Sequence, residues 1–408
     1  MPALDRVKKS IRRVKDSVAH HQERHRPSGF QFALFDSVAM LRPDHWDALT
    51  ADQSVYFSRK YLEVLEANAP TNLRMHYALI YQGGAPVAAI VAQAVEVRAD
   101  SVPRPGIKKA AKASLAKIKE RILICGNLLS WGFHGVAFAK DAAPSEVWPA
   151  VAEALYRIRR ADKLFGETGL VMVKDLDDAI HADAGSLSRF SYRPLVTEPN
   201  MVFRVDPNWA SFEDYLKDLR SGYRNSVKKV MKDFDEGGFR LERLDAAGVE
   251  VHRDLIDGLY HQVHDQQKLR LISLNPGFIP ALAKAFGDDF RTRIARGPNG
   301  EVVGFITTLR DRQGAVGYYI GFDKVAAAAG APIYLRLLQC SIQDAIEMKA
   351  RWLSLGRTAL QPKAQLGAQP EALRCYVRHR IPAMNALVRG FLNFMPEPDT
   401  APERNPFK

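Results

Sequence analysis

The same order of hydrophobic patterns occurs twice along the chain, and this repeat restricts the folds open to it. Each half places strand-like runs before a long amphipathic helix, which a short buried strand follows. In the first half the strand-like runs lie at 30–35, 73–81, 87–97, 122–131 and 136–139, the shorter helices at 44–51 and 58–68, the long helix at 145–164 and the final strand at 170–173. In the second half the helices lie at 211–235, 248–267 and 278–286, the strands at 291–295, 302–309 and 315–322, the long helix at 332–349 and the final strand at 352–355.

An internal duplication accounts for this repeat, with two unrelated α/β domains as the alternative. The match is clearest between WGFHG at 131–135 and GYYIG at 317–321. We therefore expect an α/β (α+β) protein with two tandem units, each a mixed and mostly antiparallel sheet flanked by helices. The expected division is a basic N-terminal segment, a first unit with a basic insertion at 98–121, a second unit and a tail, at 1–28, 29–198, 199–396 and 397–408.

Positive charge is concentrated in two short segments. The chain has 58 Lys and Arg against 46 Asp and Glu, a net charge of +12. Residues 1–27 hold eight basic and three acidic residues, and residues 98–121 hold eight basic and two acidic ones. The rest of the chain is nearly neutral, which excludes a uniformly basic nucleic-acid coat. Apolar stripes at 4–18 and 107–122 predict basic amphipathic helices that bind an anionic partner, either anionic lipid or an acyl carrier protein. Two solubilising helices are the alternative.

The remaining composition predicts a cytoplasmic protein without a metal site. The cysteines Cys125, Cys340 and Cys375 form no C-x-x-C pair, so neither a disulfide framework nor a thiolate zinc site is expected. The N-terminus lacks the apolar core of a secretory signal. The uncharged stretch 77–95 contains the turn sequence QGGAP, which predicts two strands in place of a membrane span.

The stretch 317–367 is the most informative part of the chain. A predicted strand ends at Asp323, a loop of small residues follows, and a helix opens after Gly330-Ala331-Pro332. The N-terminus of a helix beside a strand end suits a pyrophosphate, because its free N–H groups and its dipole attract anions. A plain strand–loop–helix connection is the alternative.

These residues resemble the GNAT superfamily, and more narrowly its branch related to Fem-type peptidoglycan aminoacyltransferases and cellulose-associated acetyltransferases. The resemblance rests on YYIGFD at 318–323, GAPIYL at 330–335, LGRTA at 355–359 with Lys363 and LG at 366–367, FEDYL at 212–216 and LYHQVH at 259–264. It implies tandem GNAT folds and transfer of an acyl or aminoacyl group to an amine. The usual acetyl-CoA signature, Arg/Gln-x-x-Gly-x-Gly/Ala, is replaced by KVAAAAG at 324–330. Acyl-CoA as co-substrate, an acyl carrier protein and aminoacyl-tRNA therefore all stay open as donors.

Acyl transfer to an amine requires a base and groups that stabilise the oxyanion. His261 and His264 lie three residues apart on one predicted helix face, and a histidine titrates near neutral pH. Either one is a candidate base, and Asp323 is the fallback. Tyr319 is a candidate proton donor to the leaving thiolate; alternation places it on one face with Gly317 and Gly321. Core packing and a solvated helix face are the alternatives.

Basic residues suggest where anions bind. Arg357 and Lys363 follow a strand end and are candidates for a donor phosphate or a substrate carboxylate. Arg220, Arg224 and Lys228 are spaced four apart on a predicted helix and are candidates for another anionic partner. A solvated face is the alternative.

The sequence thus predicts a cytoplasmic N-acyltransferase, attached peripherally to the inner face of the membrane, that moves an acyl group from a thioester to a small-molecule or lipid-linked amine by direct attack. The alternatives are a Fem-like aminoacyltransferase that uses tRNA on a cell-wall precursor and a non-catalytic adaptor at the membrane surface. The resemblance to GNAT proteins further implies that the strand at 317–323 separates from the strand at 352–355 and leaves a V-shaped gap in which the donor binds.

Overall fold

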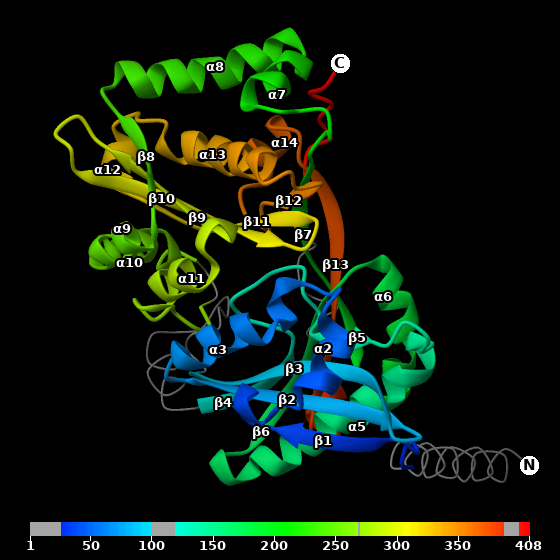
Figure 1. The fold of residues 1–408 in the computed structure, drawn as a ribbon. Helices are drawn as coiled ribbons and strands as arrows, with labels where there is room; N and C mark the ends of the chain where they lie inside the picture. The colour runs from blue at the N-terminus through cyan, green and yellow to red at the C-terminus, as the bar shows by residue number, and fades with distance from the viewer. Residues whose placement is uncertain (1–25, 99–118, 268–269, 387–399) are drawn as a thin grey trace, which may run out of the picture.

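The computed structural model describes residues 26–98, 119–267, 270–386 and 400–408. The basic helix predicted at 4–18 and residues 107–118 of the one predicted at 107–122 lie outside these residues. The first unit, blue to green in Figure 1, has the repeat order that the sequence predicts. Its elements are β1 (Gln31–Phe35), α2 (Pro43–Thr50), α3 (Arg59–Ala67), β2 (Leu73–Gln82), β3 (Ala85–Arg98), β4 (Lys119–Cys125), β5 (Val136–Phe138), α5 (Pro144–Ala161) and β6 (Thr168–Leu176).

The second unit follows after a helix and a long connecting strand, α6 (Asp178–Asp183) and β7 (Arg193–Arg204). Its elements are α7 (Phe212–Asp218), α8 (Ser221–Glu236), β8 (Arg240–Leu244), α9 (Ala246–Val251), α10 (Arg253–His264), α11 (Phe278–Phe286), β9 (Phe290–Arg296), β10 (Val302–Asp311), β11 (Gly314–Phe322), α12 (Lys324–Ala328), α13 (Ile333–Glu347), β12 (Trp352–Ser354) and α14 (Leu360–Gln365). The last strand is β13 (Gln369–His379).

A single mixed sheet runs through both units. Its strand order is β1-β2-β3-β4-β6-β13-β7-β12-β11-β10-β9-β8. Each unit contributes the same series, because β1, β2, β3, β4 and β6 correspond in order to β8, β9, β10, β11 and β12, and α5 corresponds to α13. This correspondence confirms tandem units built on mixed, mostly antiparallel sheets. The units meet at β7 and β13, and the expected division at 198/199 lies within β7.

Helices cover the sheet because one face of each is apolar. Helix α5 begins at Pro144, a position whose N–H would have no partner within the helix, so proline loses no hydrogen bond there. The helix buries Val147, Val151 and Leu155 against the sheet. Each such side chain contributes about 1.5–3 kcal/mol to folding. In the second unit α8 and α13 lie on one face of the sheet, and α10 and α11 lie on the other, toward the first unit (Figure 1).

The two units share one hydrophobic core. Tyr61 of α3 and Phe133, both from the first unit, belong to the same buried cluster as Phe278 of α11 and Tyr318 of β11. The hydroxyl groups of Tyr61 and Tyr318 are 2.7 Å apart and form a hydrogen bond inside this cluster. The position of one unit therefore depends on the other.

The structure corrects several predicted boundaries. The predicted helix at 211–235 is two helices, because Leu219 is extended and forms a β-bridge with Phe407. The predicted helix at 248–267 is divided at His252. Part of the predicted small-residue loop is the short helix α12, which Asp323 caps. The helix predicted at 107–122 is wrong at its end, because residues 119–122 belong to β4, and residues 126–135 form a loop where strand was predicted to 131.

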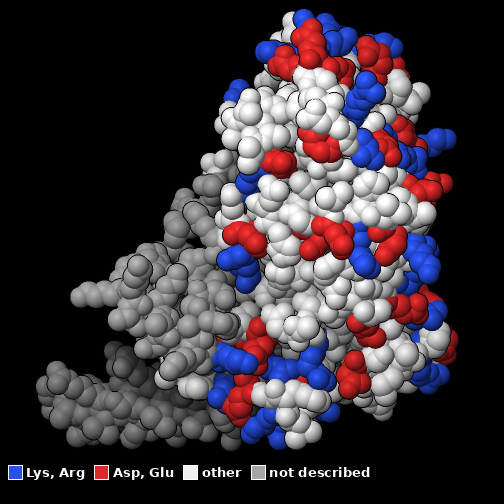
Figure 2. Space-filling view, turned by 90° about the vertical axis from the view of Figure 1, so that its left-hand side faces the viewer, with Lys and Arg blue, Asp and Glu red and all other residues white. Residues whose placement is uncertain are grey.

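No helix among the described residues is long and apolar enough to cross a membrane. The uncharged stretch at 77–95 forms the hairpin β2–β3, as predicted. On the face in Figure 2, basic and acidic side chains are interspersed over the described residues, which agrees with the nearly neutral body of the chain.

Candidate functional site

Strands β11 and β12 separate soon after they meet, as the V-shaped gap requires. Their parallel pairing joins Ala315 to Leu353 and Val316 to Ser354, and it ends there. From Gly317 onward β11 keeps its partner β10 on one side and has no pairing with β12 on the other. The expectation of a gap between 317–323 and 352–355 is therefore confirmed.

A β-bulge lies where the gap begins. The register between β10 and β11 shifts so that Tyr318 and Tyr319 together lie opposite Thr307. The Thr307 side chain fixes the bulge, because its Oγ1 accepts from the Tyr319 N–H at 2.9 Å and donates to the Tyr319 carbonyl at 3.3 Å. A bulge bends its strand and strengthens the local twist, which helps to turn β11 away from β12.

The bulge changes which residues share a face. A Cβ at Gly321 would meet Leu259 of α10, the helix against which Tyr319 packs, so these two positions share a face as predicted. A Cβ at Gly317 would meet Ser341 of α13 on the opposite face. Strict alternation thus fails at Gly317, because the bulge inserts one residue between it and Tyr319.

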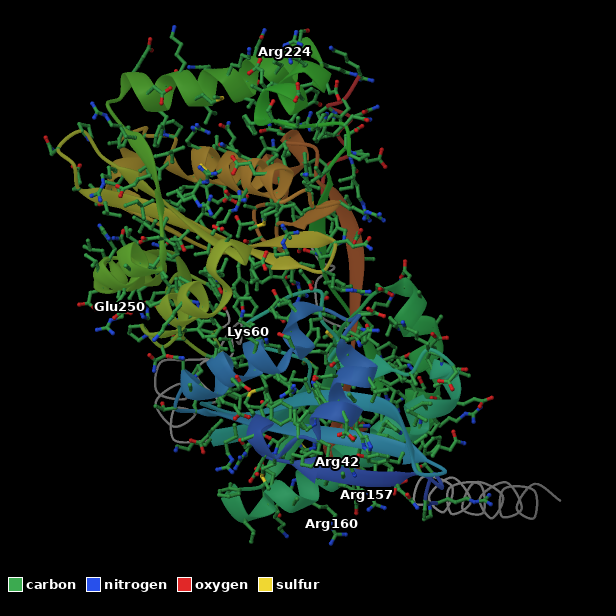
Figure 3. All side chains as sticks on the ribbon, in the orientation of Figure 1. Arg42, Lys60, Arg157, Arg160, Arg224 and Glu250 are labelled. Carbon is green, nitrogen blue, oxygen red and sulfur yellow. The ribbon has the colours of Figure 1, made fainter. Side chains whose placement is uncertain are left out.

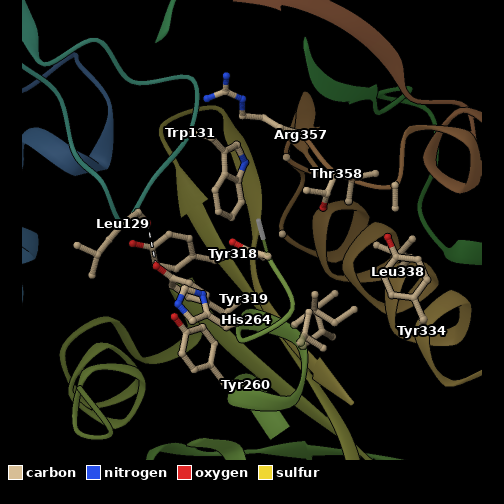
Figure 4. Close-up of a pocket in the computed structure, with 18 of the residues that line it drawn as sticks. Leu129, Trp131, Tyr260, His264, Tyr318, Tyr319, Tyr334, Leu338, Arg357 and Thr358 are labelled. Atoms are coloured by element: carbon tan, nitrogen blue, oxygen red, sulfur yellow. Dashed lines mark hydrogen bonds between the residues drawn. The ribbon is translucent and has the colours of Figure 1, made fainter. Parts of the chain in front are cut away.

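A cavity of about 550 Å³ occupies the gap. Its walls come from β11, α10, α13, the segment after β12 and a loop of the first unit (Figure 4). In the close-up, Tyr260, His264 and Tyr319 form one wall, and Tyr334 and Leu338 of α13 lie across from them. The lining is mainly apolar and aromatic, with a few polar groups, which is usual for a small-molecule site.

The two candidate histidines lie in different surroundings. His264 lines the cavity, stacks on the Tyr260 ring at 4.8 Å, and has its Nε2 3.3 Å from the Ser273 hydroxyl. Burial lowers the pKa of His264, which the nearby Asp265 carboxylate only partly opposes. His261 does not line the cavity; its ring lies 3.3 Å from Asp265, and its side chain is 37% exposed. The structure therefore places His264, and not His261, beside the cavity.

Tyr319 lies in the cavity wall, and its hydroxyl proton is already donated in a hydrogen bond. Its hydroxyl donates to the Leu129 carbonyl of the first unit at 3.0 Å. Burial raises its pKa well above the usual value, so the phenol stays protonated at neutral pH. A role as proton donor to the substrate would require this hydrogen bond to exchange.

Lys363 is a buried cation that lines the cavity. It lies on α14, its residue is 3% exposed, and among the described residues none pairs with its ammonium group. Burial lowers its pKa to about 7. An unpaired buried charge is costly, so this lysine is either neutral or ready to receive a negative group in the cavity.

Arg357 lines the same cavity but its guanidinium is engaged elsewhere. It lies 3.0 Å from Asp175 of the first unit and donates to the Glu198 carbonyl at 3.2 Å. In Figure 4 it extends past Trp131. A role on a donor phosphate remains a prediction, and the structure shows Arg357 joining the two units.

In the loop predicted to bind phosphate, most backbone N–H groups are already hydrogen-bonded within the loop itself. The Asp323 carboxylate accepts from the N–H groups of Val325 and Ala326, so this fallback base is a helix cap. The N–H groups of Ala327, Ala329, Gly330, Ala331 and Ile333 donate to carbonyls between 323 and 331. Gly330, Ala331 and Pro332 do not line the cavity. A pyrophosphate would find few free N–H groups here unless α12 rearranged.

The predicted anion row on the helix at 211–235 lies away from the cavity. Arg220 precedes α8, Arg224 lies on α8 at the outside of the molecule (Figure 3), and Lys228 is 3.5 Å from Glu213. None of the three lines the cavity. Among the described residues, no group of three or more His, Cys, Asp or Glu side chains could hold a metal ion.

Sequence reasoning missed the contribution of the first unit. Leu128, Leu129 and Trp131 lie on the loop after β4 and form part of the cavity wall. Lys174 holds this loop by donating to the carbonyls of Asn127 and Ser130 at 2.9 and 2.8 Å. The sequence offers one signal for this contribution, since the adjacent charges Lys174 and Asp175 directly follow an apolar strand. It does not show which loop these side chains bind.

Part of the second unit matches a known family model. Residues 221–364 match the family model of an acetyltransferase (GNAT) domain. Among curated proteins, none matches the chain by sequence. The solved structure of FemX is 10% identical with a TM-score of 0.51, and the match covers 84% of this chain and 96% of FemX.

Two further solved structures have lower scores. A tandem GNAT protein from the clavulanic acid biosynthesis pathway is 10% identical with a TM-score of 0.49, covering 86% of this chain and 99% of that protein. The C-terminal domain of a lysylphosphatidylglycerol synthetase from Agrobacterium fabrum is 11% identical with a TM-score of 0.47, covering 87% and 96%. The match identifies residues 221–364 of the second unit as a GNAT acetyltransferase domain, within which β11 and β12 separate, and the fold of the chain resembles that of FemX.

Proposed function

We propose that the second unit transfers an acyl group from a thioester to a primary amine by direct attack within the cavity. The observation that carries this proposal is the opening between β11 and β12, which brings His264 and Lys363 to one mainly apolar cavity. His264 is the base, because a pKa lowered by burial keeps it neutral and able to accept a proton at pH 7. Lys363 supplies positive charge for the developing oxyanion or for a substrate carboxylate.

In this proposal the protein binds the donor mainly through the donor's linear pantetheine arm. Unpaired backbone of β11 beyond Val316 can bind a pantetheine amide, and the aromatic walls can hold an acyl group. Acyl-CoA and an acyl carrier protein share this arm. The acceptor is a small-molecule or lipid-linked amine, and the positive charge of 1–27 and 98–121 favours delivery at an anionic surface. Cosedimentation with anionic and neutral vesicles tests that last point, since equal binding to both would refute it.

A second candidate is aminoacyl transfer from tRNA. The loop at 323–331, most of whose N–H groups are bonded within the loop, favours it. A donor without a pyrophosphate at this position needs no free N–H groups there. The tandem fold shared with FemX is compatible with it. A non-catalytic adaptor is less well supported, because it gives no reason for an unpaired buried lysine in an open cavity.

The experiment combines donor identification with matched variants. Native mass spectrometry of the purified protein should reveal a copurified CoA thioester or carrier protein. Transfer from acyl-CoA, acyl carrier protein and aminoacyl-tRNA to a panel of amines is then measured. We expect His264→Ala to lower turnover roughly 10²–10⁴-fold and Lys363→Met roughly 10²–10³-fold. His261→Ala, on the same helix but outside the cavity, is the control. Wild-type rates in both cavity variants would refute the proposed roles.

The pH dependence gives a second readout. The lowered pKa of His264 means that its neutral form persists below pH 6.5, its ordinary pKa. The acid limb of the rate profile that reports His264 should therefore have its midpoint below pH 6.5. A midpoint above pH 6.5 would point to another base.

A further inference from the structure

Trp131 of the first unit lies where the gap of the second unit begins. Its indole Nε1 donates to the Ser354 hydroxyl at 3.0 Å, and Ser354 is the last residue of β12 that pairs with β11. The ring lies over Gly356, where an added Cβ would come within 3.2 Å of it. It also packs against Tyr318 and Tyr319, with ring centroids 5.9 and 6.5 Å away.

The backbone on both sides of Trp131 is fixed by buried charges. The Ser130 carbonyl accepts from Lys174 at 2.8 Å, and the Gly132 N–H donates to Asp175 at 3.0 Å. Lys174 and Asp175 are themselves paired at 2.7 Å, and each is more than nine-tenths buried. A ring held in this way cannot easily move aside, because displacing it would break bonds in a low-dielectric region.

We propose that Trp131 is a specificity-determining residue that forms the end wall of the acyl pocket and limits the length of the acyl group. This inference rests on the proposed function, since it takes the linear arm of the donor to run along β11. An arm that enters the open end of the gap carries its acyl group toward the point where the strands meet. The indole ring lines the cavity and is bonded to Ser354 at that point (Figure 4).

The surroundings indicate the chemical class of that group. The lining around the ring includes Leu129, Tyr318 and Leu355, whose apolar surface favours an aliphatic acyl chain over a charged one. The guanidinium of Arg357, which also lines the cavity, is bonded to Asp175 and to the Glu198 carbonyl. The indole N–H is already bonded to Ser354, so the ring presents its apolar surface to the pocket. The first unit thus sets the chain length that the second unit accepts.

The test measures chain-length preference with and without the ring. Alkanoyl thioesters of N-acetylcysteamine, from acetyl to dodecanoyl, carry the end of the pantetheine arm and no phosphate, and their binding is measured by calorimetry. For the wild type we expect affinity to rise with length and then stop rising. For Trp131→Ala the limit moves to longer chains, with about a fourfold gain for each additional methylene that enters. Trp131→Phe should lie between them and guards against a variant that fails to fold.

A second tryptophan provides the control. Trp352 lies at the paired end of the same two strands and does not line the cavity, so Trp352→Phe should leave the length limit unchanged. An unchanged limit in both Trp131 variants would overturn the inference, and transfer by the wild type would still support the proposed function. A limit that shifts in the Trp131 variants, with no transfer from any donor, would support Trp131 as the end wall and would refute the proposed acyltransferase function.

Discussion

The two units have the same strand order, but only one of them is open. In the first unit β4 pairs with β6 from Arg121 to Cys125, along nearly the whole strand. In the second unit the corresponding pair, β11 and β12, is joined at Ala315 and Val316 alone. A repeated topology therefore does not repeat a site. The gap depends on how far one pair of parallel strands stays together.

The buried lysines of the two units show the same contrast. Lys174 at the end of β6 is bonded to two carbonyls and to Asp175, so its charge is compensated. Lys363, which is equally buried, has no partner among the described residues and faces the cavity. Compensation fits a structural role for Lys174, and its absence is the reason that we propose a functional role for Lys363.

The largest expected effect comes from removing the carboxylate that compensates Lys174 in the first unit. Asp175→Asn removes the carboxylate that pairs with Lys174 and Arg357, both poorly exposed. Leaving these two poorly exposed cations without their shared carboxylate should cost about 3–5 kcal/mol of unfolding free energy, measured by denaturant titration. Asp52→Asn is the control, because its pair with Lys140 is exposed and little should change. If both variants are equally stable, Asp175 does not hold the units together.

A pH titration sharpens the contrast between the lysines. The pKa of Lys363 is about 7 in the folded protein, against an ordinary value of 10.5. Between these values the unfolded chain binds a proton that the folded one has lost, so stability rises with pH. From pH 7 to about 9 the wild type should gain up to about 1.4 kcal/mol per pH unit relative to Lys363→Met. Parallel stability curves would mean that Lys363 is solvated or paired.

The smallest expected effect concerns the bulge that opens β11. Thr307→Val keeps the shape of the side chain but removes its bonds to Tyr319, leaving a buried N–H unpaired at a cost of about 1–3 kcal/mol. We also expect the cavity to bind acyl probes less tightly. Thr292→Val on the neighbouring strand is the control, because the buried Thr292 hydroxyl has no partner to lose. Equal stability and equal probe binding in the two variants would show that Thr307 does not maintain the bulge.

Much of the fold could be predicted from local patterns. Apolar periodicity located the hairpin β2–β3, helices α5 and α13, and strands β9, β10 and β11. It missed β7, β8 and β13, because their pairing is made with distant parts of the chain and their sequences alternate weakly. The breaks at Leu219 and His252 were also missed. At Leu219 a contact with the C-terminal tail overrides helix propensity.

The candidate site could be predicted only in part. The sequence by itself determined the duplication and the candidates His264, Tyr319 and Lys363, because these follow from local order and residue type. The position of the gap followed from the resemblance of residues 317–367 to GNAT proteins. Tertiary structure decided which unit is open, where Arg357 points and that Trp131 reaches the second unit. The physical reason is that Trp131–Ser354 and Arg357–Asp175 join residues far apart in the chain. Only folding brings such partners together, so no local pattern can encode their contact.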